Sequence, residues 1–176
     1  MKEKFPIDRA NRLINSGSVI LLTCQLEDKV NIISLSWQMP VSRSPMMVAV
    51  AVGKDRFSHS QITGSGEFGI NVPTWNLIEQ VDYCGTRSGI DYDKFKECNF
   101  TPFPGEKIKV PLIQECFANL ECRVVHKYEA GDHNIFVAEV LEAWVNKGAL
   151  KGGVLDVPKI KTIQHLGGDY YAWLTR

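Results

Sequence analysis

The segment NIISLSWQMPVS, residues 31–42, is followed by GKDRFSHS at residues 53–60. The first segment alternates as a strand does, with residues 31, 33, 35 and 37 on one face and residues 32, 34, 36 and 38 on the other. The second is a basic, hydroxyl-rich turn at the start of a predicted helix. Together they offer a surface for a flat polar ring and a cationic turn for a phosphate.

The flanking segments predict more strands. Residues 18–26 and 30–37 are β-rich on either side of the polar turn Glu27-Asp28-Lys29, which predicts a hairpin. Residues 46–52 form a nearly continuous apolar run, typical of a buried strand, and residues 67–72 alternate again. Two longer alternating segments, 118–124 and 135–145, flank a turn at residues 129–132 and predict a second antiparallel hairpin.

The predicted helices are few and short. The first lies near residues 8–15, and the second at 57–63, with Asp55 as the expected N-cap and Gly64-Ser65-Gly66 at its end. A third helix is capped by Thr74 and has Leu77, Val81 and Cys84 on one face. A glycine-rich loop at residues 85–95 leads to another helix, capped by Asp91 or Asp93. Regular β-α-β alternation is missing, and no Gly-x-Gly-x-x-Gly motif lies between a strand and a helix. We therefore predict a mainly β, antiparallel barrel or sandwich in a single domain, residues 1–176.

Composition excludes several function classes. The chain has 176 residues, with 20 basic and 20 acidic side chains, so no net field attracts it to nucleic acid or to a membrane surface. No apolar run approaches the ~20 residues of a membrane span, and no signal peptide is recognisable, so we expect a cytoplasmic protein. Five cysteines without a Cys-x-x-Cys pair argue against a disulfide framework or a zinc site. We expect no metal site and find no hydrolase motif.

The turn at residues 53–60 is the main candidate for phosphate binding. Lys54 and Arg56 supply positive charge, and Ser58 and His59 supply further donors beside the free N–H groups of a helix start. A single basic turn is more often a solvated helix start whose charges face water. The neighbouring strand favours a ligand, because the face with Ser34 and Ser36 matches the polar edge of a flavin ring, although an ordinary exposed polar face explains it as well.

Three other motifs carry candidate residues. The loop at residues 85–95 either is a tight structural loop or brings Thr86, Arg87, Ser88 or Lys94 to a ligand. His133, just inside the strand after Gly131-Asp132, either donates to a ligand or is structural. The segment HLGGDYY at residues 165–171 allows close backbone approach to a ligand, or is simply a closing strand on the barrel.

Taken together, these segments resemble the flavin reductase-like family, and in particular its flavoredoxin-type branch of FMN-binding split β-barrels. The resemblance extends from about Val19 to Tyr171 and rests on the order and spacing of its motifs. The motifs are the strand at residues 31–42, RFSH at 56–59, FGINV at 68–72, SGIDYDKF at 88–95, GDH at 131–133 and HLGG at 165–168. It implies a Greek-key-like split β-barrel with a few short helices.

The resemblance also implies a homodimer in which each barrel holds one FMN near the subunit interface, with NADH or NADPH as reductant. By position, Asn31, Ser34, Ser36 and Trp37 would lie along the ring and ribityl chain. The phosphate would be surrounded by Lys54, Arg56, Ser58 and His59. His133 matches an element linked to nicotinamide and flavin contacts, and is the one candidate for a catalytic role. Family members usually carry Arg where this chain has Ile90.

Three hypotheses follow. The leading one is an NAD(P)H-dependent flavin oxidoreductase that transfers a hydride to bound FMN and passes electrons to oxygen, free flavin, a metal or a partner protein. The alternative is a non-enzymatic FMN electron carrier reduced by a protein donor. The third is a cofactor-free β-barrel interaction module.

Overall fold

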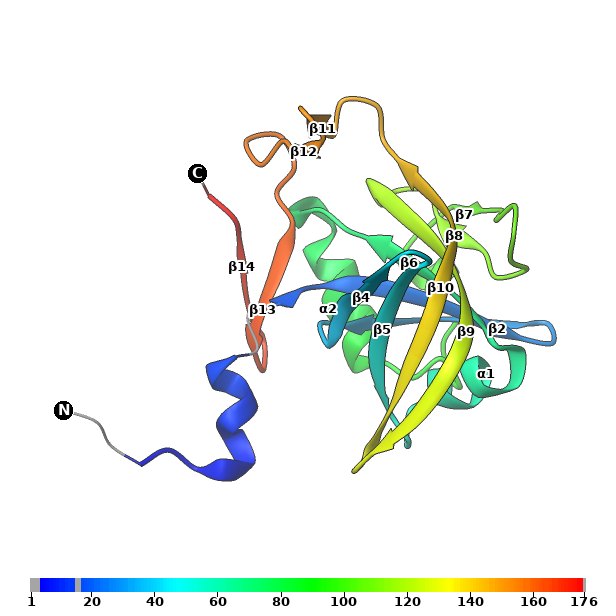
Figure 1. The fold of residues 1–176 in the computed structure, drawn as a ribbon, viewed down its shortest axis with the longest axis vertical. Coiled ribbons are helices and arrows are strands. Elements are labelled where there is room, and N and C mark those ends of the chain that lie inside the picture. Colours follow the sequence, from blue (N-terminus) through cyan, green and yellow to red (C-terminus); the bar gives the residue numbers. More distant parts are fainter. Residues whose placement is uncertain (1–3, 15–16, 176) are drawn as a thin grey trace.

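The computed structural model describes residues 4–14 and 17–175, and its centre is a seven-stranded antiparallel sheet (Figure 1). The strand order is β3-β2-β6-β9-β10-β5-β4. The strands are β2 (Ile20–Leu26), β3 (Lys29–Leu35), β4 (Gln38–Arg43), β5 (Met46–Gly53), β6 (Glu67–Val72), β9 (Ala118–Ala130) and β10 (His133–Val145). The fold is mainly β with few short helices, as predicted, and both predicted hairpins, β2–β3 and β9–β10, are present.

The two edges of this sheet, β3 and β4, are consecutive in the chain and joined only by Ser36 and Trp37. The prediction of one strand through residues 31–42 was therefore wrong. The Trp37 carbonyl accepts a hydrogen bond from the Ala51 amide (2.9 Å), and β4 then pairs with β5, at the edge opposite β3. The sheet thus curls until its edges approach each other, which is the split of the barrel.

Four helical segments accompany the sheet, α1 (Phe57–Ser65), η2 (Trp75–Leu77), α2 (Ile78–Thr86) and α3 (Lys94–Glu97). Gly66, in the left-handed region at φ 70°, ends α1. Asp93 caps α3 through the Lys96 amide, as one of the two alternatives predicted. Asp55 does not cap α1, because its carboxylate faces the Arg56 side chain (3.6 Å) and Arg56 itself occupies the N-cap position. The hydroxyl of Thr74 bonds to the Asn76 side chain rather than capping α2.

Smaller elements cover the barrel. The N-terminal segment is a 3-10 helix, η1 (Ile7–Leu13), and the last residue of that predicted helix, Asn15, lies outside the described residues. A second sheet combines β1 (Gly17–Ser18) with the hairpin β13 (Ile163–Gly167) and β14 (Tyr170–Trp173), where one closing strand on the barrel was predicted. Figure 1 shows η1, in blue, beside this hairpin. Two short hairpins remain, β7 (Pro102–Phe103) with β8 (Leu112–Ile113), and β11 (Leu150–Lys151) with β12 (Val154–Leu155).

Two apolar clusters stabilise this arrangement. The first fills the barrel and includes Leu22, Phe68 and Phe136. The second lies between the sheet and α2, where the predicted face of Leu77, Val81 and Cys84 is buried. Strand β2 contributes alternate residues to both clusters, so it is buried on both faces. All five cysteines are buried in the two clusters. Among the described residues, no helix has the length and apolar character needed to cross a membrane.

A buried carboxylate anchors the loop between β7 and β8. Glu121 of β9 is 0% exposed and accepts hydrogen bonds from the Trp144 indole and from the amides of Glu106, Lys107 and Ile108. Burial alone would raise the pKa of Glu121, but these four hydrogen bonds hold its pKa below the usual value. The ionised form therefore stabilises the folded chain.

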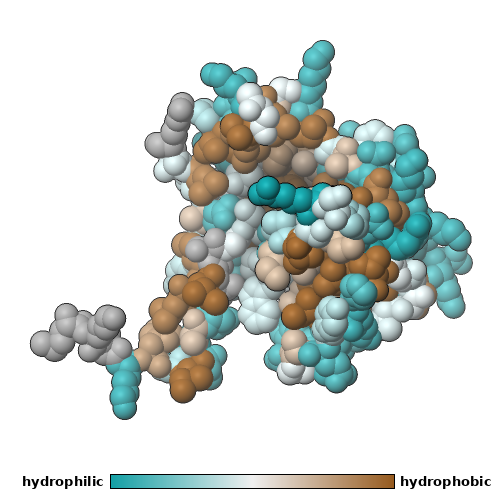
Figure 2. Space-filling model, viewed as in Figure 1, coloured by the Kyte–Doolittle hydropathy of each residue, from teal (hydrophilic) through white to brown (hydrophobic). Residues whose placement is uncertain are grey.

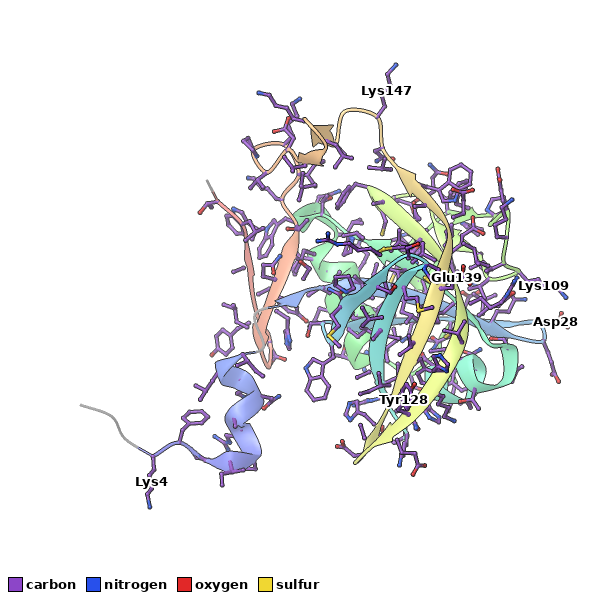
Figure 3. The ribbon with its side chains drawn as sticks, in the orientation of Figure 1. Lys4, Asp28, Lys109, Tyr128, Glu139 and Lys147 are labelled. Carbon is purple, nitrogen blue, oxygen red and sulfur yellow. The ribbon has the colours of Figure 1, made fainter. Side chains whose placement is uncertain are left out.

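We predict that Glu121→Gln lowers the free energy of unfolding by about 2 kcal/mol at neutral pH, because an amide cannot accept all of these bonds. A carboxylate whose pKa is lower in the folded state than in the unfolded state stabilises the fold at pH values above its unfolded pKa. This contribution disappears as the pH falls through the folded-state pKa. Urea denaturation should show the difference between variant and wild type shrinking at acid pH. The control is Glu139→Gln on β10 (Figure 3). A Glu121→Gln protein as stable as wild type at neutral pH would contradict this role.

Candidate functional site

A cleft lies at the split of the barrel and consists of two adjoining cavities. The larger has a volume of about 400 Å³ and the smaller about 130 Å³. Four residues line both cavities, Ile33, Arg56, Gly85 and Thr86. Strand β3 forms one wall, the end of β5 beyond its pairing with β4 forms another, and α2 and the β13–β14 turn close the sides.

The large cavity combines apolar and polar walls. Ile33, Leu35, Ala51 and Val52 provide apolar surface from β3 and β5. Ser34 and Ser36 interrupt that surface with hydroxyl groups. The Ser34 hydroxyl donates to the Val81 carbonyl (2.7 Å), so its oxygen faces a ligand only as an acceptor.

The polar face predicted for the strand is thus partly used within the protein. The Ser36 hydroxyl lies 3.3 Å from Nδ1 of His165, whose Nε2 donates to the Gly168 carbonyl (2.9 Å). In a neutral imidazole this leaves Nδ1 to accept from Ser36. The chain of bonds fixes the Ser36 side chain against the β13–β14 turn.

Trp37 and His133 form the outer wall of the large cavity. Their ring centroids are 4.7 Å apart, and both residues line the cavity. Nδ1 of His133 donates to the Asp132 carboxylate (2.7 Å), which leaves Nε2 toward Gly53 and the cavity. The hydrogen bond and charge of His133 lower the pKa of Asp132, which favours the ionised carboxylate. The Asp132 carboxylate in turn orients the His133 imidazole.

The small cavity is lined by donors. It lies between the start of α1 and the loop after α2. The donors that line it belong to Arg56, Ser58, Arg87, Ser88 and Lys94. Guanidinium, ammonium and hydroxyl groups at the start of a helix match the oxygens of a phosphate. The cavity is therefore suited to an anion.

Lys94 forms the floor of this cavity. Its side chain is buried (3% exposed), and Nζ donates to the carbonyls of Ile32 (2.6 Å) and Cys84 (2.9 Å). Burial lowers the pKa of Lys94, and nearby thiols act in the opposite direction. An ammonium has three donors, so one remains for a ligand.

The hydrogen bonds of the Asn31 side chain indicate whether a phosphate fits the small cavity. Its Nδ2 donates to the Ser58 hydroxyl (2.8 Å), while its buried Oδ1 has no hydrogen-bond partner. Gly89 approaches so closely that a Cβ there would overlap the Asn31 amide. With the amide turned over, Ser58 donates to Oδ1, and Nδ2 becomes a donor beside Gly89, which lines the same cavity. The orphaned atom and the donor set together fit a bound phosphate.

Two predicted site residues lie outside both cavities. Lys54 pairs with Glu129 on the β9–β10 hairpin (3.6 Å). His59 points toward β10, where its Nε2 bonds to the Asn134 side chain (2.7 Å). The others line the large cavity (Ser34, Ser36, Trp37, His133), the small cavity (Asn31, Ser58, Ser88, Lys94) or both (Arg56).

Some cavity residues were not singled out from the sequence. Asn11 and Arg12 come from η1, and Asp82 from α2. No local motif marks any of the three. The position of η1 depends on pairing between the two ends of the chain, through β1 and β13. Within residues 4–14 and 17–175, no group of three His, Cys, Asp or Glu side chains could hold a metal ion.

Comparison with known proteins agrees with this geometry. The family model described as "Flavin reductase like domain" matches residues 12–163. The chain belongs to the flavin reductase-like family. The fold is accordingly the split barrel found in structures of this family.

Individual relatives differ in what is known of them. An uncharacterized protein of Archaeoglobus fulgidus is 41% identical over 138 residues, 78% of this chain and 77% of that protein. An "NADH-dependent FAD reductase" of Streptomyces globisporus is 34% identical over 58% of this chain and 56% of its own length. The crystal structure of a flavoredoxin from Methanosarcina acetivorans superposes with a TM-score of 0.88 at 32% identity, covering 99% of this chain and 93% of that one.

Proposed function

We propose that this protein is an NAD(P)H-dependent flavin oxidoreductase that binds FMN in the cleft. The observation that carries the proposal is the junction of a donor-lined cavity and a larger, mixed apolar and polar cavity at Arg56. FMN has the same two parts, a compact phosphate and a flat ring. A relative of this family is named as an NADH-dependent flavin reductase, which agrees with this activity.

Each group of residues has a part in this proposal. The phosphate is held by Arg56, Ser58, Ser88, Lys94 and the turned amide of Asn31. The ring lies between the apolar side chains of β3 and β5, with Ser34 and Ser36 as acceptors toward its polar edge. Lys54 and His59 contact other parts of the protein and are not included.

Bound FMN would supply a ring that takes up a hydride from the nicotinamide and releases electrons to an acceptor. The protein's own contribution is alignment and shielding. Val52 and Ile33 exclude water from one side of the large cavity, and Trp37 and His133 form its outer wall. Asp132 holds His133 in one orientation for contact with a ligand. Positioning reacting atoms at ~3–3.5 Å is a large part of catalysis, so no side chain is needed as acid or base.

The activity is tested by anaerobic stopped-flow mixing of FMN-loaded protein with NADH and, separately, NADPH. We expect the oxidised flavin absorbance to bleach in a reaction that saturates with at least one reductant. Loss of this absorbance with a ferredoxin-like donor but with neither nicotinamide would support the electron carrier instead. A protein that does not bind added FMN would refute both proposals and favour an interaction module.

Arg56→Ala should weaken FMN binding about tenfold or more, because a charge-assisted contact to phosphate is lost. Titration of FMN fluorescence with protein measures the dissociation constant. The control is Lys4→Ala, which removes an exposed charge at the far end of the N-terminal segment (Figure 3). Equal affinities for the two variants would exclude Arg56 from the phosphate site.

We also propose a homodimer, on the basis of the exposed apolar side chains of β4 and of the start of β5. Met39, Val41 and Met46 are 56%, 42% and 41% exposed, and Ile7, Leu13 and Ile14 of the N-terminal segment are more exposed still. Figure 2 shows apolar surface both over the sheet and on this N-terminal segment. Exposed apolar surface of this kind is typical of a protein interface.

Met39→Glu should therefore dissociate the dimer, because it buries a charge in the interface. Sedimentation velocity measures the mass of the variant, of Met39→Leu as a control, and of wild type. A wild-type protein that sediments as a monomer at micromolar concentration would refute the dimer.

A further inference from the structure

Arg12 reaches the cleft from outside the barrel. It lies near the end of η1 and lines the large cavity, but it does not line the small, donor-rich cavity that we assign to the phosphate of FMN. Its guanidinium lies against the turn of the β13–β14 hairpin, at Gly167 and Gly168. The large cavity thus has a second guanidinium, on a different element from Arg56.

The turn is shaped to receive this side chain. A Cβ at Gly167 would lie 2.6 Å from Nη1 of Arg12, closer than two such atoms approach. Gly167 and Gly168 also have φ values of 112° and 58°, which favour glycine. Only a turn without side chains at these positions lets the guanidinium rest on the backbone, and Gly167 is buried in consequence. Packing against this turn therefore defines the position of the Arg12 guanidinium.

Arg12 has no ion-pair partner in the part of the chain that the structure describes, although Asp82 and Asp169 line the same cavity. A guanidinium at a cavity wall can bind an anionic group in bidentate fashion. The two carboxylates can accept hydrogen bonds from hydroxyl or amide donors on the same ligand. Together they match a molecule with both a phosphate and sugar hydroxyls.

We propose that Arg12 binds the phosphate-bearing part of the reductant, a nicotinamide nucleotide, while its nicotinamide ring reaches the large cavity. This inference rests on the proposed function and assigns that function a second anion subsite, separate from the FMN phosphate. Arg12 is a binding residue here and takes no part in the transfer of electrons. Removal of the Arg12 side chain should weaken the binding of only those reductants that carry a phosphate.

The test compares two reductants, NADH and 1-benzyl-1,4-dihydronicotinamide, which has the same reactive ring but no phosphate. We expect Arg12→Ala to raise KM for NADH about tenfold with little change in kcat, and to leave KM for the benzyl analogue unchanged. Arg12→Lys should recover part of the loss. Arg9→Ala, on the same 3-10 helix, is the matched control and should behave as wild type. Affinity for FMN should be the same in all four proteins.

The possible failures are distinguishable. If wild type oxidises NADH and Arg12→Ala has the same KM, or if KM rises equally for both reductants, the assignment of Arg12 is overturned and the proposed function stands. If wild type oxidises the benzyl analogue but not NADH, the proposed phosphate subsite at Arg12 is overturned. If FMN-loaded wild type oxidises neither reductant, the proposed function fails, and this inference fails with it.

Discussion

The hydrogen bonds of one buried lysine join the elements that surround the cleft. Lys94, at the start of α3, donates to a carbonyl of β3 and to the last turn of α2, so a single ammonium fixes an edge strand and two helices relative to one another. An ammonium buried without partners would cost several kcal/mol, so these bonds are a condition of the local fold. The same side chain lines the small cavity beside Ser58 and Asn31.

The rest of the cleft follows from how the sheet closes. Two strands that are adjacent in sequence, β3 and β4, lie at opposite edges of one sheet, and the short connection at Ser36 and Trp37 brings these edges together without pairing them. The gap is lined by side chains of β3 and by the end of β5. A flat ligand can lie there against apolar side chains and meet hydroxyl acceptors, while its charged tail lies among the donors near α1.

Local sequence patterns predicted much of the fold, because the hairpins, the buried strand β5 and the glycine that ends α1 depend on neighbouring residues. The site was predicted less well. Lys94 was expected to contact a ligand, and its bonds to the carbonyl of Ile32, far away in the chain, could not be inferred from spacing. Lys54 was grouped with Arg56 by proximity, yet the hairpin places Glu129 beside it. Arg12 reaches the cleft only because β1 pairs with β13, a contact between the two ends of the chain.

In the cleft as we interpret it, the small cavity holds the phosphate of a flavin whose ring lies in the large cavity. The most direct measurement is a comparison of FMN with riboflavin, which has the same ring and ribityl chain but no phosphate, by calorimetric titration at one ionic strength. FMN should bind at least ~100-fold more tightly than riboflavin, as expected for several charge-assisted contacts to one phosphate. Equal dissociation constants for the two flavins would contradict it.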